Sequence, residues 1–215
     1  MSKYLWILDA GHGGIIDGLY QTAGKRSPVW EDGSQLFEGE FNRKVLDRLI
    51  ELLDEAGYQW ASATLGQQDV PLRERTDFAN DVYRRERQKR SGRLKPVFIS
   101  IHADAFSKPS AGGWSVYTSP GETRSDKIAE VFYESAEESL PEFRMRRDTR
   151  DGDNDKEANF WVLKKTVMPA ILTENLFMTN PAECKFLMSE EGVERIVGLH
   201  FNAIQQIEES NKRYA

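Results

Sequence analysis

Two histidines in this sequence follow apolar runs of strand length, a placement that could serve metal chemistry. His12 comes after the run at 4–8, and His102 comes directly after the run at 96–101. In an open α/β sheet the carboxyl ends of parallel strands meet at one edge, so these imidazoles could lie close together. A catalytic zinc ion takes three protein ligands, commonly imidazole or carboxylate, and leaves a fourth position open for water. The pair therefore predicts a metal site that needs one further ligand.

Several carboxylates could supply that ligand. Glu174 follows a third apolar run, at 168–173. The main candidates are Glu38, Glu40 and Glu174, and Asp9 and Asp104 are less favoured candidates. A histidine at the end of a strand is also often a satisfied polar residue, so either histidine alone would favour a structural role. Both together, with carboxylates nearby, favour a metal, and the residues alone leave the third ligand open.

The third histidine and the only cysteine fit structural roles. His200 falls inside a predicted helix, and Cys184 lies in "PAECKFL", a predicted amphipathic helix with no histidine next to it. A catalytic thiolate needs a positioned base, so we expect both residues to be packing residues. A single cysteine also excludes an intramolecular disulfide framework.

The elements that would position these groups alternate along the chain. The three apolar runs do not alternate with polar residues, which is typical of strands covered on both faces. Two further strands are predicted at 58–63 and 113–119, and segments with helical spacing lie at 41–57, 70–88, 125–140 and 191–209. This order predicts an α/β fold: a twisted, mostly parallel sheet, flanked by helices on both faces, with the zinc site at the carboxyl ends of the strands. The polar segments 14–35 and 144–159 are predicted to be exposed loops.

Length and composition set further bounds. With 215 residues, 39% of them hydrophobic, we expect a single domain over residues 1–215 with a substantial core. A net charge of -6 argues against nucleic acid or an anionic membrane as a partner. No run approaches the roughly 20 apolar residues of a membrane span, and the first residues lack the pattern of a signal peptide. We therefore expect synthesis in the cytoplasm without a Sec-type signal, no membrane insertion and no nucleic-acid partner.

Five blocks of the sequence together resemble the zinc-dependent N-acetylmuramoyl-L-alanine amidases, a family that includes bacterial autolysins, cell-division amidases and phage endolysins. In order, the blocks are "LDAGHGG" (8–14), "EGEFN" (38–42), "LRERTDFAN" (72–80), "SIHADA" (100–105) and "PAILTENLFMTNP" (169–181). The resemblance covers most of the chain from residue 4 to about 187. Within the third block, we expect Arg75 and Asn80 to be structural and to hold the second helix against the sheet.

The resemblance implies one Zn²⁺ per chain, held by His12, Glu38 and His102, with Glu174 as the catalytic acid/base. The family cleaves the amide between N-acetylmuramic acid and L-alanine of the peptidoglycan stem peptide. Zinc can lower the pKa of its bound water to about 7, and a nearby carboxylate can move the protons, so the residues suit this reaction.

The chain departs from the family pattern at two positions and in one loop. The family commonly has Asn where this chain has Asp104, and a small or apolar residue where Asn175 stands. Either change can tune the surroundings of the ligands or have no effect. Residues 14–35 do not match the usual Gly-rich continuation after the first histidine, so no substrate contacts are carried over to that loop.

We interpret the chain as a peptidoglycan amidase, specifically a phage or prophage lysis enzyme. It would act on the cell wall after release, as a monomer, and would need a separate membrane-permeabilising partner to reach the wall. Two other classes are open: a catalytically silent wall-binding module of the same fold, which would require a broken ligand set, and a zinc peptidase acting on another amide. Fold and metal do not by themselves fix the substrate.

Overall fold

A six-stranded sheet forms the centre of the computed structural model, which describes residues 2–150, 152–211 and 214. The strand order is β4-β1-β5-β8-β6-β7. The parallel part consists of β4 (Gln59–Ser62), β1 (Tyr4–Ala10), β5 (Lys95–Asp104) and β8 (Ala170–Phe177). Beyond it, β6 (Ser115–Thr118) runs antiparallel to β8, and β7 (Lys156–Glu157) pairs in parallel with β6. The predicted mostly parallel sheet is confirmed.

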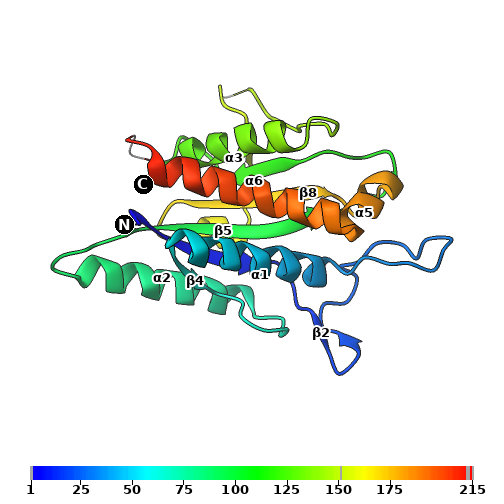
Figure 1. Cartoon of the computed structure of the whole chain (residues 1–215), viewed down its shortest axis with the longest axis horizontal. Helices are drawn as coiled ribbons and strands as arrows, with labels where there is room; N and C mark the ends of the chain where they lie inside the picture. Colours follow the sequence, from blue (N-terminus) through cyan, green and yellow to red (C-terminus); the bar gives the residue numbers. More distant parts are fainter. Residues whose placement is uncertain (1, 151, 212–213, 215) are drawn as a thin grey trace.

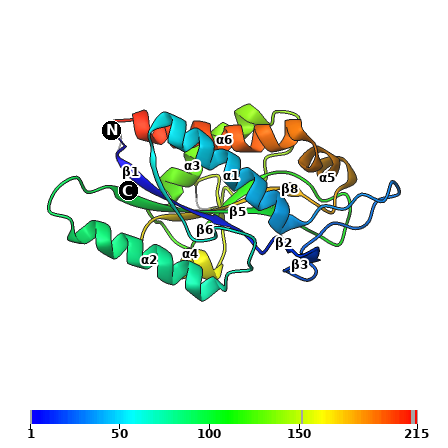
Figure 2. The ribbon, with the colours of Figure 1, turned by 60° about the horizontal axis from the view of Figure 1, so that its bottom comes forward.

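Helices cover both faces of this sheet, as predicted (Figures 1 and 2). One face carries α1 (Glu38–Ala56), α3 (Asp126–Ser139), α5 (Pro181–Met188) and α6 (Glu190–Glu209). The other face carries α2 (Leu72–Gln88) and the short α4 (Trp161–Lys165). A large apolar core lies under the first group, and a smaller one, which includes Phe98 and Leu172, lies under the second. In the part of the chain that the structure describes, no helix is long and apolar enough to cross a membrane.

The two central strands are longer than their apolar runs. Residues 102–104 and 174–177 continue the ladder, because β5 and β8 pair with each other up to Asp104 and Phe177. Backbone hydrogen bonding does not require apolar side chains, so the polar residues extend these strands instead of ending them. His102 and Glu174 are therefore fixed in the sheet and do not lie in the loops that follow it.

Helix α1 begins three residues before the predicted start at residue 41. Glu38 and Glu40 occupy its first turn, where acidic side chains interact favourably with the helix dipole. Its other end was predicted correctly: Gly57 has a φ of 70° and its N–H caps the carbonyl groups of Leu53 and Asp54.

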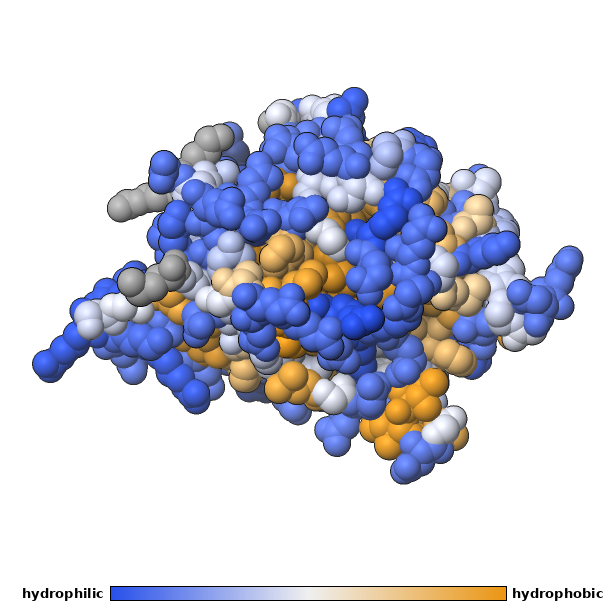
Figure 3. Space-filling view, in the orientation of Figure 1, coloured by the Kyte–Doolittle hydropathy of each residue, from blue (hydrophilic) through white to orange (hydrophobic). Residues whose placement is uncertain are grey.

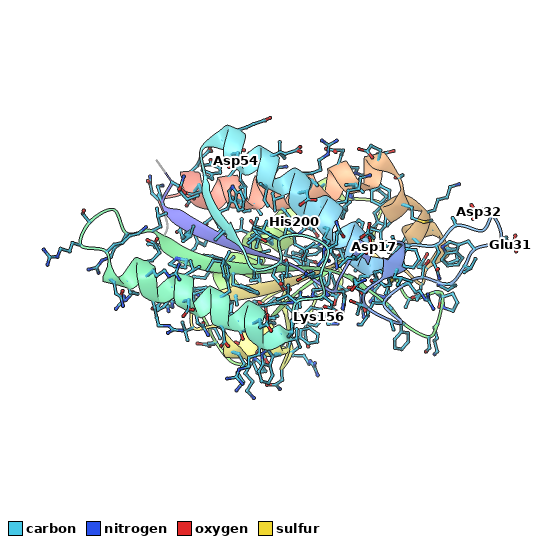
Figure 4. The ribbon with its side chains drawn as sticks, turned by 90° about the horizontal axis from the view of Figure 1, so that it is seen from below. Asp17, Glu31, Asp32, Asp54, Lys156 and His200 are labelled. Carbon is cyan, nitrogen blue, oxygen red and sulfur yellow. The ribbon has the colours of Figure 1, made fainter. Side chains whose placement is uncertain are left out.

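The two predicted loops contain short elements that the sequence pattern did not reveal. A hairpin of β2 (Ile15–Ile16) and β3 (Leu19–Tyr20) lies within 14–35, and β7 lies within 144–159. Elements of two residues are too short to show a periodicity. Apolar side chains gather on the surface of the hairpin (Figure 3), where Leu19 is 70% exposed. Further along the same loop, Glu31 and Asp32 lie at a tip that projects from the body of the protein (Figure 4).

His200 and Cys184 are buried, as their positions in the sequence predicted. The His200 ring lies in the interior (Figure 4), where Nδ1 donates to the carbonyl oxygen of Ile196 at 2.7 Å and Nε2 lies 3.0 Å from the hydroxyl of Thr173. A carbonyl can only accept, so Nδ1 carries the proton of the neutral ring and Nε2 accepts from Thr173. Burial lowers the pKa of His200 to about 4.

We expect replacement of His200 by Gln to weaken the acid sensitivity of the fold. The pKa of His200 is about 4 in the folded chain and about 6.5 in the unfolded chain, so the unfolded state binds more protons between these values. Stability conferred by the neutral ring is present above about pH 6.5 and is lost as the pH falls towards 4. Between about pH 7 and pH 4.5, the free energy of unfolding should fall by about 2 kcal/mol more in the parent than in His200→Gln.

Urea unfolding at the two pH values measures this difference. Phe132→Leu is a matched control, because the Phe132 ring packs 5.7 Å from the His200 ring and does not titrate. It should lower stability at both pH values and keep the acid sensitivity of the parent. Equal falls in the parent and His200→Gln would contradict the assignment.

Candidate metal centre

Three of the residues singled out in the sequence meet at the carboxyl end of the sheet. Nε2 of His12 lies 3.2 Å from Oε1 of Glu38, and Nδ1 of His102 lies 3.0 Å from the same oxygen. One ligand atom from each residue lies within 4.8 Å of the other two. The two rings stand edge to face, with their centroids 5.0 Å apart. Two imidazole nitrogens and a carboxylate oxygen thus converge on one point.

Glu174 stands beside this cluster because of the register of the sheet. His102 on β5 is directly paired with Glu174 on β8. Side chains alternate along a strand, so His102 lies on the same face as Phe98, and Glu174 on the same face as Leu172. Phe98 and Leu172 both belong to the smaller core, under α2 and α4. His102 and Glu174 therefore lie side by side on that face, further towards the carboxyl ends of their strands.

His12 is held through its backbone by two buried arginines. Its φ of 65° is in the left-handed region, which non-glycine residues adopt only when their surroundings enforce it. Nη1 of Arg43 donates to the carbonyl oxygen of His12 at 2.6 Å, and Nη2 of Arg75 donates to the same oxygen at 3.4 Å. The predicted structural role of Arg75 is confirmed by its contacts with Asp9 and Ala10 of β1, and it extends to the backbone of a candidate ligand.

Two glycines allow the close approach of the segments that carry the ligands. A Cβ atom on Gly11 would lie 2.2 Å from Cε1 of His102, and one on Gly39 would lie 1.8 Å from the carbonyl oxygen of Gly13. Any larger residue at position 11 would displace the His102 ring, and any at position 39 would push the start of α1 away from the loop after His12. Both glycines are therefore part of the construction of the site.

Glu38 is a buried carboxylate whose charge is supported by its neighbours. The residue is only 2% exposed. Burial on its own raises the pKa of the Glu38 carboxyl, but the hydrogen bonds and charge interactions with His102 and His12 outweigh burial and hold the pKa below its usual range. Glu38 is therefore ionised at neutral pH, which is the state that ligates a metal ion.

Glu174 has the opposite electrostatic environment. Burial raises the pKa of its carboxyl well above the usual range, and the negative charges of Glu38 and Asp104 add to this effect, against Lys25 and Arg146. Its Oε2 is buried and has no hydrogen-bond partner among the described residues. One oxygen of Glu174 is thus left available for a group that enters the site.

The other carboxylates considered as ligands have different partners. Oε1 of Glu40 accepts from the backbone N–H of Ile15 at 2.7 Å. Asp9 accepts from Arg75 at 3.0 Å and from Ser100 at 2.6 Å. Asp104 accepts from Arg146 at 2.9 Å. Of the five candidates, Glu38 is the carboxylate that lies with His12 and His102 in the one cluster of possible metal ligands found among the described residues.

Three further residues support the site but were not identified from the sequence as doing so. For Arg43, the only hint in the sequence is a charge one helical turn after Gly39. Its Nη1 also donates to the carbonyl oxygen of Gly39. Asn175, noted only as a departure from the family pattern, is buried and donates to the carbonyl oxygen of His102 at 2.9 Å. Its Oδ1 accepts from the indole N–H of Trp114 at 2.8 Å. These contacts fix the backbone on either side of the ligand cluster.

Comparisons with known proteins identify the family of this chain. The family model described as N-acetylmuramoyl-L-alanine amidase matches residues 7–206. The uncharacterized protein YqiI of Bacillus subtilis (strain 168) is 27% identical over 197 residues, which cover 92% of this chain and 81% of that protein. The endolysin of Bacillus phage SPP1 is 25% identical over 210 residues, covering 96% of this chain and 66% of the endolysin.

The fold is also that of solved amidase structures. The N-acetylmuramoyl-L-alanine amidase from Clostridium difficile 630 superposes with a TM-score of 0.74 and 21% identity, covering 99% of this chain and 100% of that one. The matched residues 7–206 include His12, Glu38, His102 and Glu174. From β1 almost to the end of α6, this chain belongs to the N-acetylmuramoyl-L-alanine amidase family.

Proposed function

We propose that this chain is a zinc-dependent amidase that hydrolyses the bond between N-acetylmuramic acid and the L-alanine of the peptidoglycan stem peptide. His12, Glu38 and His102 hold the zinc ion, one per chain, and Glu174 is the catalytic acid/base. The observation that carries the proposal is the convergence of two imidazole nitrogens and one ionised carboxylate oxygen next to a second glutamate. We further propose that residues 1–215 act as one catalytic domain and as a monomer.

The donor set fits zinc better than other common ions. Imidazole nitrogen and carboxylate oxygen are ligands that Zn²⁺ takes in catalytic sites, whereas Mg²⁺ and Ca²⁺ prefer oxygen alone. Three protein ligands leave the fourth position that a catalytic site needs. A catalytically silent wall-binding module would require a broken ligand set, whereas all three proposed ligands are present in this chain.

The mechanism follows from what surrounds the reacting amide. A zinc ion in this site would act as a Lewis acid on the scissile carbonyl and lower the pKa of the attacking water. Oε2 of Glu174 has no other partner among the described residues, so it can accept a proton from that water. The same carboxyl can then donate the proton to the amine nitrogen of L-alanine as the C–N bond breaks. Arg43 and Arg75 keep His12 in its strained conformation throughout, because they bond its carbonyl oxygen.

The lysis role is supported by one relative. The phage SPP1 endolysin aligns over 96% of this chain, and that protein's name describes an enzyme that acts on the cell wall from inside an infected cell. We propose that this chain has the same role in a phage or prophage and reaches the wall with the help of a membrane-permeabilising partner.

Digestion of purified peptidoglycan tests the reaction. We expect new free amino termini of L-alanine and no new reducing sugar ends, because only the lactyl–alanine amide is cut. Labelling of amino groups, followed by mass spectrometry of the released stem peptides, identifies the cut. New amino termini at another residue would support the zinc peptidase instead.

Zinc content tests the metal site. The purified chain should carry about one zinc ion, and His102→Ala should lose both the metal and the activity because two ligands do not hold zinc firmly. Elemental analysis after dialysis measures the content. Full zinc occupancy in His102→Ala would overturn the assignment of His102 as a ligand.

Substitution of the two glutamates should reduce activity for different reasons. Glu38→Ala should lose zinc because it removes a ligand, whereas Glu174→Gln should keep the metal and the fold and lose about 10²–10⁴-fold in turnover, the range of general acid–base catalysis. Zinc content, thermal stability and amidase rate are measured on both proteins.

Glu40→Gln is the matched control, because the amide oxygen of Gln can still accept from Ile15 and the variant should keep both zinc and rate. A zinc-free Glu174→Gln, or one nearly as fast as the parent, would show that the role given to Glu174 is wrong.

A further inference from the structure

An arginine with unused hydrogen-bond donors lies at the edge of the sheet that carries the candidate metal centre. Nη1 of Arg146 donates to Oδ2 of Asp104 at 2.9 Å, and Asp104 stands two residues beyond His102 on β5. Cζ of Arg146 lies 4.6 Å from the centre of the Phe177 ring, at the end of β8. The Arg146 side chain therefore lies at the carboxyl ends of the two strands that carry His102 and Glu174.

The backbone of Arg146 is also fixed in place. Its N–H donates to the carbonyl oxygen of Trp114 at 2.8 Å, and the N–H of Trp114 donates to the carbonyl oxygen of Arg144 at 2.9 Å. The segment 144–146 thus pairs with the residue before β6. A Cβ atom on Gly113 would lie 2.3 Å from the carbonyl oxygen of Arg144, so glycine permits this close approach. The loop 144–159 therefore begins with an anchored arginine.

The guanidinium group of Arg146 keeps donors for a ligand. It has five N–H donors in one plane, and among the described residues its hydrogen-bond acceptor is Asp104. The side chain is 28% exposed, so a ligand can reach it from solvent. Phe177 and Asp104 hold the group in one orientation, which lowers the entropy lost when a ligand binds. Such a group suits a carboxylate, which can accept two parallel N–H bonds.

Arg146 is close enough to the acid/base for its charge to act there. Burial raises the pKa of the Glu174 carboxyl, and Arg146 is one of the positive charges that oppose this rise. The other cation that acts on Glu174 is Lys25, an exposed residue whose ammonium group has no fixed partner among the described residues. Lys156 (Figure 4) is already occupied, since its Nζ donates to the hydroxyl of Tyr117 at 3.0 Å. Arg146 is therefore the cation best prepared to bind an anion beside Glu174.

We propose that Arg146 is a specificity-determining residue, which binds a free carboxylate on the stem-peptide residue that follows L-alanine. The inference rests on the proposed function, in which Glu174 acts at the bond before L-alanine. One extended residue spans about 3.5 Å, so a group close to Glu174 meets the residue next to L-alanine. That residue carries a carboxylate in some peptidoglycans and the corresponding carboxamide in others. A carboxamide is uncharged and places N–H donors opposite those of Arg146, so the chain should prefer the carboxylate form.

The proposal also gives a role to Asp104, where the family commonly has Asn. A carboxylate accepts a charge-assisted hydrogen bond from a guanidinium group, which is stronger than the bond to a neutral amide oxygen. The backbone of Asp104 belongs to β5, and its carbonyl oxygen accepts from the N–H of Met178 at 2.9 Å. A rigid strand thus orients the arginine that the loop 144–159 supplies.

Two muramyl peptides that differ only in this group, carboxylate or carboxamide, test the proposal on the zinc-loaded chain. We expect kcat/KM to be at least about tenfold higher for the carboxylate form, as the loss of a hydrogen bond to a charged group predicts. Arg146→Gln should lower kcat/KM for the carboxylate form by about the same factor and change that for the carboxamide form less than about twofold. A purely structural role of Arg146 would instead lower both values equally.

Two controls make the result specific. Arg150→Gln removes the same charge from the same loop, where the guanidinium group bonds Asp148 and the side chain is 88% exposed, and it should keep the preference of the parent. Calorimetry with the two free stem peptides needs no turnover, so tighter binding of the carboxylate peptide by a chain that hydrolyses neither substrate would support the role of Arg146 and overturn the proposed function. Equal rates on the two substrates, or a preference that survives in Arg146→Gln, would overturn the proposal and leave the amidase assignment untouched.

Discussion

One carbonyl oxygen, that of His12, holds the catalytic end of this fold together. Arg43 from α1 and Arg75 from α2 both donate to it, although the two helices cover opposite faces of the sheet. Both guanidinium groups are buried and are satisfied there by acceptors: Arg75 by Asp9 and backbone carbonyls, Arg43 by backbone carbonyls. Because five donors lie in one rigid plane, an arginine can link several strands and loops at a single point, which a lysine cannot do. The strained backbone of His12 is thus supported from both layers of the protein.

Helix α1 connects this anchor to the carboxylate of the metal centre. Its first turn carries Glu38, and Arg43 lies little more than one turn later, so the same rigid helix binds the backbone of one candidate ligand and supplies another. Gly39 permits this arrangement, because its missing side chain leaves room for the carbonyl oxygen of Gly13. Glu38 can remain buried and ionised only with the two imidazoles beside it, which makes the helix start, the loop after β1 and strand β5 mutually dependent.

Much of this arrangement was predictable from the sequence, and the exceptions have physical causes. The apolar runs identified the strand that precedes His12 and the two strands that carry His102 and Glu174, because strands covered on both faces must be apolar. Their true ends were missed, since polar residues such as Glu174 keep the backbone ladder. Which carboxylate joins the two histidines also could not be chosen from the residues alone, because five carboxylates were candidates. Only the fold shows that Glu38 lies with both histidines and that Asp9, Glu40 and Asp104 bond other groups. Asn175 was noted only as a departure from the family pattern. Its bond to the carbonyl oxygen of His102 was not predicted, because a contact with a backbone oxygen leaves no pattern in the sequence.

The two glutamates of the site show why residue type alone does not give a role. Glu38 lies between two imidazoles, which outweigh burial and lower the pKa of its carboxyl. Burial raises the pKa of the Glu174 carboxyl, and the charges of Glu38 and Asp104 add to this effect. The helix start places the first carboxylate where it can bind a cation. The strand register places the second beside that position, with one oxygen that has no hydrogen-bond partner among the described residues. Two identical side chains are thus driven apart in acidity by the fold, which is the division that a metal ligand and an acid/base require. The chemistry of the site is therefore a property of the topology that brings three strand ends and one helix start to the same edge.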